Sequence, residues 1–255
     1  MTDTTAPGRR IKTADRLFHI VQTIQELDGA TPTELADTMD ISVSTVHNYL
    51  TTLVAAQYVV NNGGVYEIGL RFLDHGVHAQ QNRAVYSVAR NPLKELAEET
   101  GEVIWLMVEE HGYAINIDKM MGANAVQTFG RVGKRSPLHC HAAGKAILAA
   151  LPPERVTEII TTRRLDAMTP KTITDKETLL SELDQIRDQG YASNDGELIP
   201  SVRSVSAPIV TESQVHGAVS IGGPEHKLQG EYFEQELPAL VKGVTNEIEL
   251  KLEYM

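Results

Sequence analysis

The chain has 255 residues, enough for two ordinary domains, and 42% of them are hydrophobic and 22% charged. These proportions are typical of a protein with a packed core and exclude a largely disordered chain. The formal net charge of −11 is unfavourable for a class of protein that binds nucleic acid, because such proteins normally neutralise phosphates with Lys and Arg.

The sequence also indicates a compartment. No run of about 18 apolar residues occurs, so no segment is expected to span a membrane. Residues 1–8 lack the apolar core of a signal peptide. Cys140 is the only cysteine, which excludes an internal disulfide and fits a reducing environment. We therefore expect a cytoplasmic protein without a membrane partner.

The first part of the chain is expected to contain three helices. Apolar residues recur within residues 15–27 at the spacing of one buried helical face. Residues 31–34 (TPTE) have the pattern of a capping box with proline at the first helical position, and open a second, short helix. Ser42 or Ser44 can cap a third helix, which is expected to end near Ala56.

A hairpin is predicted after the third helix, because residues 61–64 (NNGG) separate two strand-like runs. Three helices and a hairpin, with a short turn between the second and third helix, are typical of a winged helix-turn-helix. In that fold the third helix enters the major groove of DNA. The residues of its cap and outward face that can hydrogen-bond to bases are Ser42, Ser44, Thr45, His47, Asn48, Thr51 and Thr52. The alternative is the polar face of an ordinary helix.

A basic run, residues 9–12 (RRIK), precedes the first helix. Arg9 and Arg10 are candidate contacts to the DNA backbone or minor groove. The alternative interpretation of this run is a flexible, solubilising tail.

The rest of the chain is expected to alternate strands and helices. A helical connector is predicted over 70–90, and Pro92 is expected to restart a helix that ends at Gly101. The later elements, in chain order, are strands at 102–109 and 113–121, a helix at 141–151, a helix at 174–189 that begins with a capping box, strands at 204–210 and 215–221, and an amphipathic helix at 230–253. This order indicates an α+β fold with helices packed on an antiparallel sheet.

Several segments share a pattern with one family. They are residues 42–53 (SVSTVHNYLTTL), 66–73 (YEIGLRFL), 130–140 (GRVGKRSPLHC), 143–149 (AGKAILA) and 217–224 (GAVSIGGP). In order and with plausible spacing over nearly the whole chain, they resemble the IclR family of transcriptional regulators. The resemblance implies a winged helix-turn-helix over 10–71, after a flexible tail at 1–9, and a linker helix with a GAF-like effector-binding and oligomerisation domain over 72–255.

The resemblance also implies a function. Family members are sequence-specific DNA-binding regulators that respond to a small metabolite, here expected to be a carboxylic or sugar-derived acid of a catabolic pathway. The implied partners are double-stranded operator DNA, the effector and further copies of the chain in a homodimer or tetramer. Carried over from the family, the effector-binding positions are Ala142, Ala143, Asn194, Ser204 and Ser220.

In the third helix the chain departs from the family at two positions. The family often has Lys or Arg where Val43 stands and Arg where Asn48 stands, so two positive charges are missing. One physical account is adaptation to high intracellular salt, which screens phosphate contacts and favours an acidic surface. The sequence is therefore interpreted as that of a halophilic archaeal regulator.

Three other interpretations compete with this one. Residues 218–222 (AVSIG) loosely match the serine elbow of hydrolases, but that motif needs a strand–turn–helix setting, so no enzyme is predicted. Residues 139–141 (HCH) bring metal-ligand types together, but consecutive positions do not easily converge on one ion, so no metal or cofactor is predicted. The third alternative is a metabolite-binding module that uses its helix-turn-helix for protein association.

Overall fold

The computed structural model describes residues 11–126, 130–212 and 214–255. The predictions for the tail at 1–9 and for Arg9 and Arg10 lie outside these residues. The chain divides into two compact units between Ala79 and Gln80. This division falls within the helix α4 (Arg71–Gln81), which belongs to both units.

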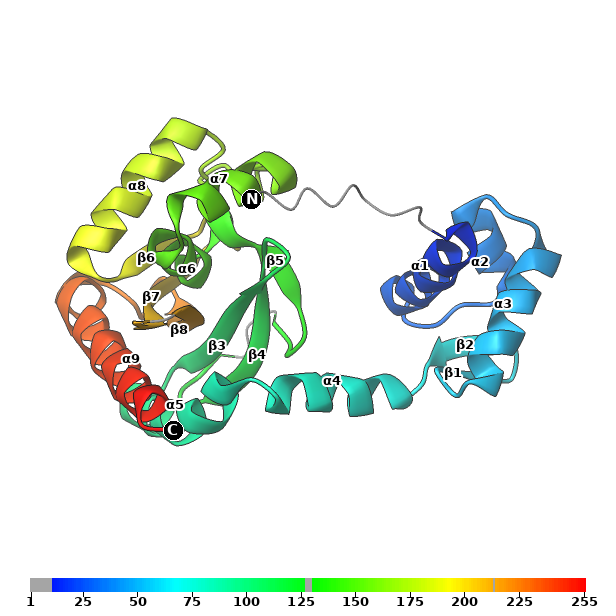
Figure 1. The fold of residues 1–255 in the computed structure, drawn as a ribbon, viewed down its shortest axis with the longest axis horizontal. Coiled ribbons are helices and arrows are strands. Elements are labelled where there is room, and N and C mark those ends of the chain that lie inside the picture. The colour runs from blue at the N-terminus through cyan, green and yellow to red at the C-terminus, as the bar shows by residue number, and fades with distance from the viewer. Residues whose placement is uncertain (1–10, 127–129, 213) are drawn as a thin grey trace. The chain divides into compact units, whose positions relative to one another are not determined.

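The N-terminal unit contains the three predicted helices and the hairpin (Figure 1). They are α1 (Lys12–Glu26), α2 (Pro32–Met39), α3 (Val43–Ala55), β1 (Val59–Asn62) and β2 (Val65–Ile68). Their apolar faces meet in one core, which includes Ile20, Ile24, Leu35, Val46, Leu50 and Leu53. The predicted winged helix-turn-helix is thus confirmed.

Local chemistry explains these boundaries. The Thr31 side chain accepts a hydrogen bond from the backbone N–H of Glu34, and the Glu34 carboxylate accepts one from the backbone of Thr31, which completes the predicted capping box. Ser42, not Ser44, caps α3. Gly63 and Gly64 form the two-residue turn of the hairpin with φ of +64° and +97°, values that favour glycine at both positions.

The C-terminal unit is built on a six-stranded antiparallel sheet with the strand order β5-β4-β3-β8-β7-β6. The strands are β3 (Val103–Glu110), β4 (Tyr113–Met121), β5 (Arg135–Pro137), β6 (Ala192–Asp195), β7 (Val202–Thr211) and β8 (Gln214–Pro224). The predicted α+β class with an antiparallel sheet is confirmed.

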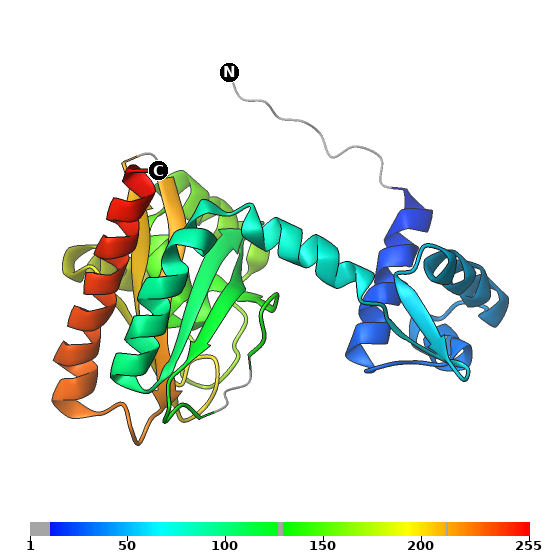
Figure 2. The same cartoon turned by 90° about the horizontal axis from the view of Figure 1, so that it is seen from below.

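Helices cover both faces of this sheet. On one face α5 (Ala84–Thr100) and α9 (Leu237–Glu253) lie side by side (Figure 2) and pack on Ile104, Leu106 and Val219. On the other face lie α6 (Ala142–Ala150), α7 (Pro153–Arg163) and α8 (Lys176–Gln189). Because side chains alternate along a strand, β3 gives Ile104 and Leu106 to the first face and Trp105 and Met107 to the second.

Some predicted elements were wrong. The helix expected to restart at Pro92 begins at Ala84, because the chain breaks at Asn82–Arg83, and Pro92 lies inside α5. After α6, Pro153 opens α7, which was not predicted, at a position where proline needs no N–H partner. The cap of α8 is Asp175, which accepts from the N–H of Thr178, so the predicted box starting at residue 174 does not form.

Two further differences concern strands and the last helix. The short strands β5 and β6 were not predicted, and the segment Tyr232–Glu236 is a π-helical turn before α9 begins. In the described part of the chain, no helix is both long and apolar enough to cross a membrane.

Candidate functional site

The exposed side of α3 is polar apart from Val43 and Val54, and it carries no Lys, Arg, Asp or Glu. Ser42, Ser44, His47, Asn48, Thr51 and Thr52 are exposed, and Thr45 is half-buried. The hydroxyl of Thr51 donates to the backbone oxygen of His47, and that of Thr52 donates to the backbone oxygen of Asn48. Both threonines therefore offer outward methyl groups and oxygen lone pairs, and the donors on this face are His47, Asn48 and the hydroxyls of Ser42 and Ser44.

The first turns of α4 are fixed to Tyr58, which lies between α3 and the first strand of the hairpin. The Tyr58 hydroxyl lies 2.6 Å from Nε2 of His75, and the Tyr58 ring centroid lies 4.7 Å from that of Phe72. The Arg71 guanidinium stacks over the Tyr58 ring at 5.0 Å and donates to the backbone oxygen of Ala56. The start of the linker helix and the wing therefore form one packed cluster.

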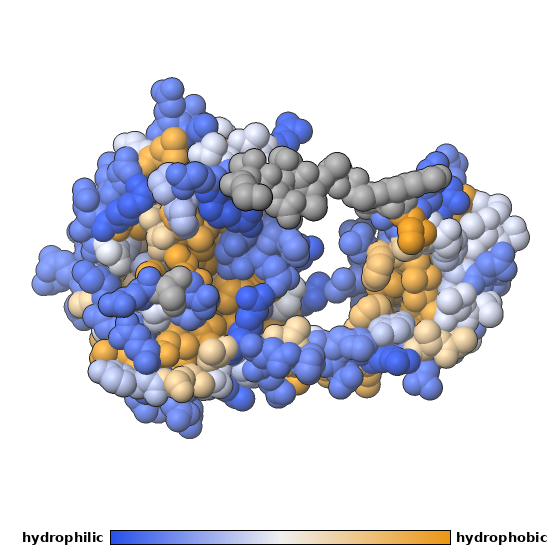
Figure 3. Space-filling view, viewed as in Figure 1, coloured by the Kyte–Doolittle hydropathy of each residue, from blue (hydrophilic) through white to orange (hydrophobic). Residues whose placement is uncertain are grey.

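The C-terminal unit contains a cavity of about 340 Å³ on the face of the sheet that carries α6. Its floor crosses four adjacent strands, with lining residues Asn116 from β4, Trp105 and Met107 from β3, Ser220 and Gly222 from β8, and Val202 and Ser204 from β7. The remaining lining residues are Gly130, Lys134, Arg135, Ser136, Pro137, His141, Met168, Leu198 and Ile199. In the space-filling view this unit shows a recessed band of apolar residues bordered by hydrophilic ones (Figure 3).

His141 lines this cavity and also caps α6. Its Nδ1 accepts a hydrogen bond from the N–H of Gly144, and its Nε2 lies 3.1 Å from the Ser136 hydroxyl. Burial, together with the nearby Lys145 and His139, lowers the pKa of His141 to about 4. The ring is therefore neutral near pH 7 with its proton on Nε2, where it donates to Ser136, and the Ser136 proton remains available to a ligand.

The charge of the cavity lining is one-sided. Lys134 and Arg135 are exposed at its edge, and no Asp or Glu occurs among the described lining residues. The Arg135 guanidinium lies 4.8 Å from the Tyr113 ring centroid. A cavity with two cations, hydroxyls and an apolar floor is suited to a small organic anion.

A buried ion cluster supports one wall of the cavity. Lys145 is 1% exposed, and its Nζ lies 2.6 Å from carboxylate oxygens of both Glu182 and Glu197. Burial raises the pKa of Glu197 above its ordinary value, although Lys145 opposes the shift. Because Leu198 and Ile199 follow Glu197 directly and line the cavity, this ion pair fixes the segment that forms the wall.

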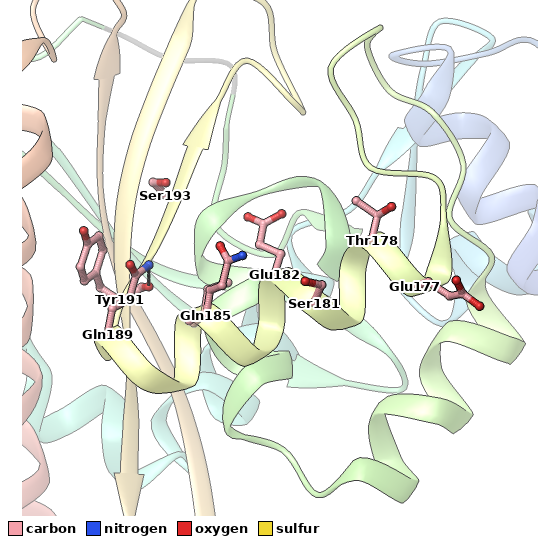
Figure 4. Close-up of a pocket in the computed structure, with 9 residues that line it drawn as sticks. Glu177, Thr178, Ser181, Glu182, Gln185, Gln189, Tyr191 and Ser193 are labelled. Carbon is pink, nitrogen blue, oxygen red and sulfur yellow. Dashed lines mark hydrogen bonds between the residues drawn. The ribbon is translucent and has the colours of Figure 1, made fainter.

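A second hollow, with a volume of about 640 Å³, runs along the outer side of α8. In Figure 4 the side chains of Glu177, Ser181, Glu182 and Gln185 project from α8 along this groove, and Ser193 lies across from them. The groove is polar and carries two carboxylates, which would repel an acid. It is therefore a poorer candidate for an anionic ligand than the cavity over the sheet.

The predicted effector positions divide into two groups. Ser204 and Ser220 line the cavity. Ala142, Ala143 and Asn194 are not among its lining residues, and their role in effector binding stays a prediction. The two alanines are buried in the first turn of α6, where they pack in the core. Asn194 is committed within the protein, because its Nδ2 donates to the Cys140 backbone oxygen and its Oδ1 accepts from the Glu197 N–H.

Sequence reasoning missed Trp105, Asn116, Ser136 and His141, which line the cavity. The apolar run within residues 102–109 predicted a strand but did not indicate which face would hold a ligand. A further close approach explains the glycine at 144, where a Cβ would lie 2.0 Å from the Leu138 backbone oxygen. No side chain larger than hydrogen fits there.

The other candidate motifs have plain structural settings. Ser220 lies in the middle of β8, so it does not occupy a strand-to-helix elbow. In residues 139–141, the His139 ring bonds the Asp166 backbone oxygen, the Cys140 thiol donates to the Pro137 oxygen, and the His141 ring bonds Ser136 and Gly144. Among the described residues, no group of three His, Cys, Asp or Glu is arranged to hold a metal ion.

Comparison with known proteins agrees with these two units. Residues 13–63 match the IclR helix-turn-helix domain, and residues 77–250 match the C-terminal domain of the bacterial transcriptional regulator IclR. The chain is 35% identical over 250 residues to the probable HTH-type transcriptional regulator ArcR of Halobacterium salinarum, a match that covers 96% of this chain and 95% of the relative.

Solved structures have the same fold. The crystal structure of Thermotoga maritima IclR superposes with a TM-score of 0.76 at 27% identity, over 95% of this chain and 99% of that one. An IclR homologue from Microbacterium hydrocarbonoxydans, complexed with 4-hydroxybenzoate, superposes with a TM-score of 0.81 at 21% identity, over 95% of this chain and 100% of that one. With its helix-turn-helix and its C-terminal unit both matched, the chain belongs to the IclR family of DNA-binding transcriptional regulators.

Proposed function

We propose that this regulator binds operator DNA through α3 and that a small carboxylic or sugar-derived acid in the cavity over the sheet controls that binding. The observation that carries the proposal is the cavity lining, which holds Lys134 and Arg135 but no carboxylate among its described residues. An acid would set its carboxylate against these cations and the Ser136 hydroxyl. Its body would lie on Trp105 and Met107.

The size of the cavity supports a metabolite rather than a polymer. A volume of about 340 Å³ lies at the lower end of the range of ligand pockets, roughly 300–1,000 Å³. The homologue from Microbacterium hydrocarbonoxydans was crystallised in complex with a small organic acid, 4-hydroxybenzoate. Ser204 and Ser220, at the other side of the floor, would orient the far end of the ligand.

DNA recognition by α3 would depend on hydrogen bonds more than on charge. Asn48 can pair with adenine, His47 can donate to a base acceptor, and the methyl groups of Thr51 and Thr52 can contact a thymine methyl. Arg9 and Arg10 would add phosphate contacts. A homodimer or tetramer would read an operator with two-fold symmetry.

The same proposal assigns the parts of the chain. Residues 10–71 would read DNA, and residues 72–255 would carry the linker, bind the effector and join the subunits. The anchoring of Arg71 and His75 to Tyr58 supports α4 as the element that transmits the effector signal, because a change at the linker would carry the wing with it.

The test is a gel-shift assay with DNA from upstream of the chain's own gene. Asn48→Ala is expected to weaken the complex at least about fivefold, since a bidentate base contact contributes roughly 1–3 kcal/mol. Gln22→Ala, an exposed change on α1, is the control and should leave the complex unchanged. A protein that forms no sequence-specific complex would contradict the DNA-binding role and favour an association module.

The effector half is tested by thermal shift with a panel of carboxylic and sugar-derived acids, because a bound ligand stabilises the folded state. A binding acid should change the gel shift, and Arg135→Gln should reduce its stabilisation. An acid that raises Tm but leaves both operator affinity and transcription unchanged would contradict the coupling.

The net charge of −11 and the similarity to the Halobacterium salinarum protein support a halophilic, cytoplasmic setting. Operator binding should then persist into molar KCl, because base contacts are screened less than phosphate contacts. Binding that is lost well below molar salt would rule this setting out.

A further inference from the structure

Gly222 stands inside β8 at a position where the fold does not require a glycine. Its φ lies outside the left-handed range that favours glycine. A Cβ at this position would lie 3.7 Å from the Arg203 backbone oxygen and from the Ser204 Cβ, which is ordinary van der Waals contact. The pairing of β8 with both neighbouring strands is regular here. A larger residue could therefore occupy the position without distorting the sheet.

Another glycine of the same strand has a clear structural cause. Gly217 has a φ of +147°, and a Cβ there would lie 2.2 Å from the Met107 backbone oxygen. The backbone alone therefore explains Gly217. Gly222 has no such cause, although a glycine inside a strand weakens the sheet. A strand glycine without a bulge or a close backbone contact often marks a place where a ligand approaches closely.

The missing side chain of Gly222 would face the cavity. Gly222 pairs with Ser204 on β7, and residues directly opposite each other in adjacent strands share a face of the sheet. Because side chains alternate along a strand, Gly222 also shares its face with Ser220. Both serines and Gly222 line the cavity. The cavity floor is therefore open down to the backbone at Gly222.

This open part of the floor lies away from the cavity edge that holds the cations. Asn116, whose backbone N–H donates to the Lys134 oxygen, belongs to β4, and Gly222 belongs to β8. Since β3 lies between these strands, they are about 10 Å apart. A chain of three carbon atoms spans only roughly 4 Å. An acid that occupies both parts of the floor is therefore longer than a three-carbon acid.

The side chains between these two parts are apolar. Trp105 and Met107 of β3 line the floor, and Leu198 and Ile199 line a wall. A sugar-derived acid would lose hydrogen bonds from its hydroxyls to water against these side chains, whereas an apolar body loses none. We propose that Gly222 is a specificity-determining residue, and that the effector is an elongated carboxylic acid whose apolar body extends from the cation edge to the backbone of Gly222.

This inference rests on the proposed acid-binding function of the same cavity, and its test separates the two. Titration calorimetry on the full chain compares two pairs of acids that differ by one phenyl group, namely acetate with phenylacetate and propionate with phenylpropionate. In the unaltered protein the phenyl-bearing acid should bind at least about tenfold more tightly, because its ring leaves water for the apolar floor.

Two variants then assign the preference to Gly222. Gly222→Ala and Gly222→Val place a small and a larger apolar group in the space that the ring would occupy. The preference for the phenyl-bearing acid should fall in both, by at least about fivefold in Gly222→Val, while the plain acids bind as before. Gly243→Ala, which adds a methyl group in the open middle of α9, is the control and should leave every affinity unchanged.

Thermal unfolding without acid shows whether the fold itself needs this glycine. Gly222→Ala should leave Tm unchanged or raise it, since alanine loses less conformational freedom on folding than glycine. Gly217→Ala should lower Tm, because the Met107 backbone oxygen blocks the added methyl group. If Gly222→Ala lowers Tm as Gly217→Ala does, the glycine is structural and the inference is overturned.

Each other outcome of the titrations has a definite meaning. Equal affinities within both pairs in the unaltered protein would overturn the elongated effector and leave an acid-binding cavity intact. A phenyl preference that persists in Gly222→Val, or an equal loss of affinity for both members of a pair, would also overturn the inference. If none of the four acids binds at millimolar concentration, the acid-binding function itself fails, and the inference fails with it.

Discussion

Replacing His141 with asparagine should reduce the pH dependence of stability on the acid side of neutrality. In the folded chain the buried ring has a pKa of about 4, against 6.5 for an ordinary histidine. As the pH falls from 6.5 towards 4, the unfolded chain therefore gains a proton that the folded chain does not take up. The free energy of unfolding contributed by this residue is fully present above pH 6.5 and is lost as the pH falls through the folded pKa.

The magnitude follows from the two pKa values. One pKa unit corresponds to about 1.4 kcal/mol, so the whole shift amounts to roughly 3 kcal/mol, of which about 2.5 kcal/mol is lost by pH 4.5. The cause is burial, reinforced by Lys145 and His139. Glu102 and Glu197 work in the opposite direction, because burial raises their pKa values and the folded chain then takes up protons first. The pH dependence of the total unfolding free energy therefore combines opposite contributions. Only the difference in unfolding free energy between variants isolates the contribution of His141.

The assay is urea unfolding at pH 7.5 and pH 4.5. Asparagine keeps an oxygen that can cap α6 and an amide that can donate to Ser136, but it does not titrate. The His141→Asn variant should therefore lose about 2.5 kcal/mol less than the unaltered chain between the two pH values. His111→Asn is the matched control, since His111 is exposed at a turn with φ of +54°, a conformation that asparagine tolerates. The reasoning is refuted if His141→Asn and the unaltered chain lose equal stability.

The remaining predictions concern α6, α9 and α3. Lys145→Met should destabilise the fold by about 3–5 kcal/mol in urea unfolding, because it leaves the buried carboxylate of Glu197 and the partly exposed carboxylate of Glu182 unpaired, and adding Glu197→Gln should restore part of the loss. Gly144→Ala should prevent folding, as judged by circular dichroism, whereas Gly243→Ala in the open middle of α9 should stabilise by up to about 1 kcal/mol. Val43→Lys should steepen the slope of log affinity for the operator against log salt concentration by about 0.9 for each phosphate that the new lysine neutralises. An unchanged slope would argue against α3 lying in the groove.

The N-terminal unit could be predicted because its signals are local. The Thr31 capping box and the Gly63–Gly64 turn each act within four residues, and the apolar spacing of α1 needs no partner to be recognised. The C-terminal helices were harder to predict, because their boundaries depend on tertiary packing rather than on local signals. Pro92 is tolerated inside α5 because tertiary packing of that helix on the sheet outweighs a local preference, and no local signal reports such packing.

The cavity could be predicted only in part. Ser204 and Ser220 came from the family pattern, but Trp105 and Asn116 become neighbours only through the pairing of β4, β3 and β8. A shift of one residue in that pairing would turn Trp105 to the opposite face of the sheet. The register depends on contacts between segments more than 100 residues apart, such as Trp105 with Ser220, which no local pattern encodes.

The two candidate sites resolve the apparent conflict between an acidic chain and anionic partners. The chain holds 34 acidic residues, yet α3 contains none, and none occurs among the described residues that line the cavity. Charges separated by more than about 8–10 Å are largely screened at ordinary salt, so a partner responds to the charges close to it rather than to the sum. For α3 and for the cavity edge at Lys134 and Arg135, the absence of carboxylates from the helix itself and from the described cavity lining therefore matters more than the net charge. The same screening explains why an acidic surface elsewhere is compatible with binding DNA, provided that base contacts rather than phosphates supply the specificity.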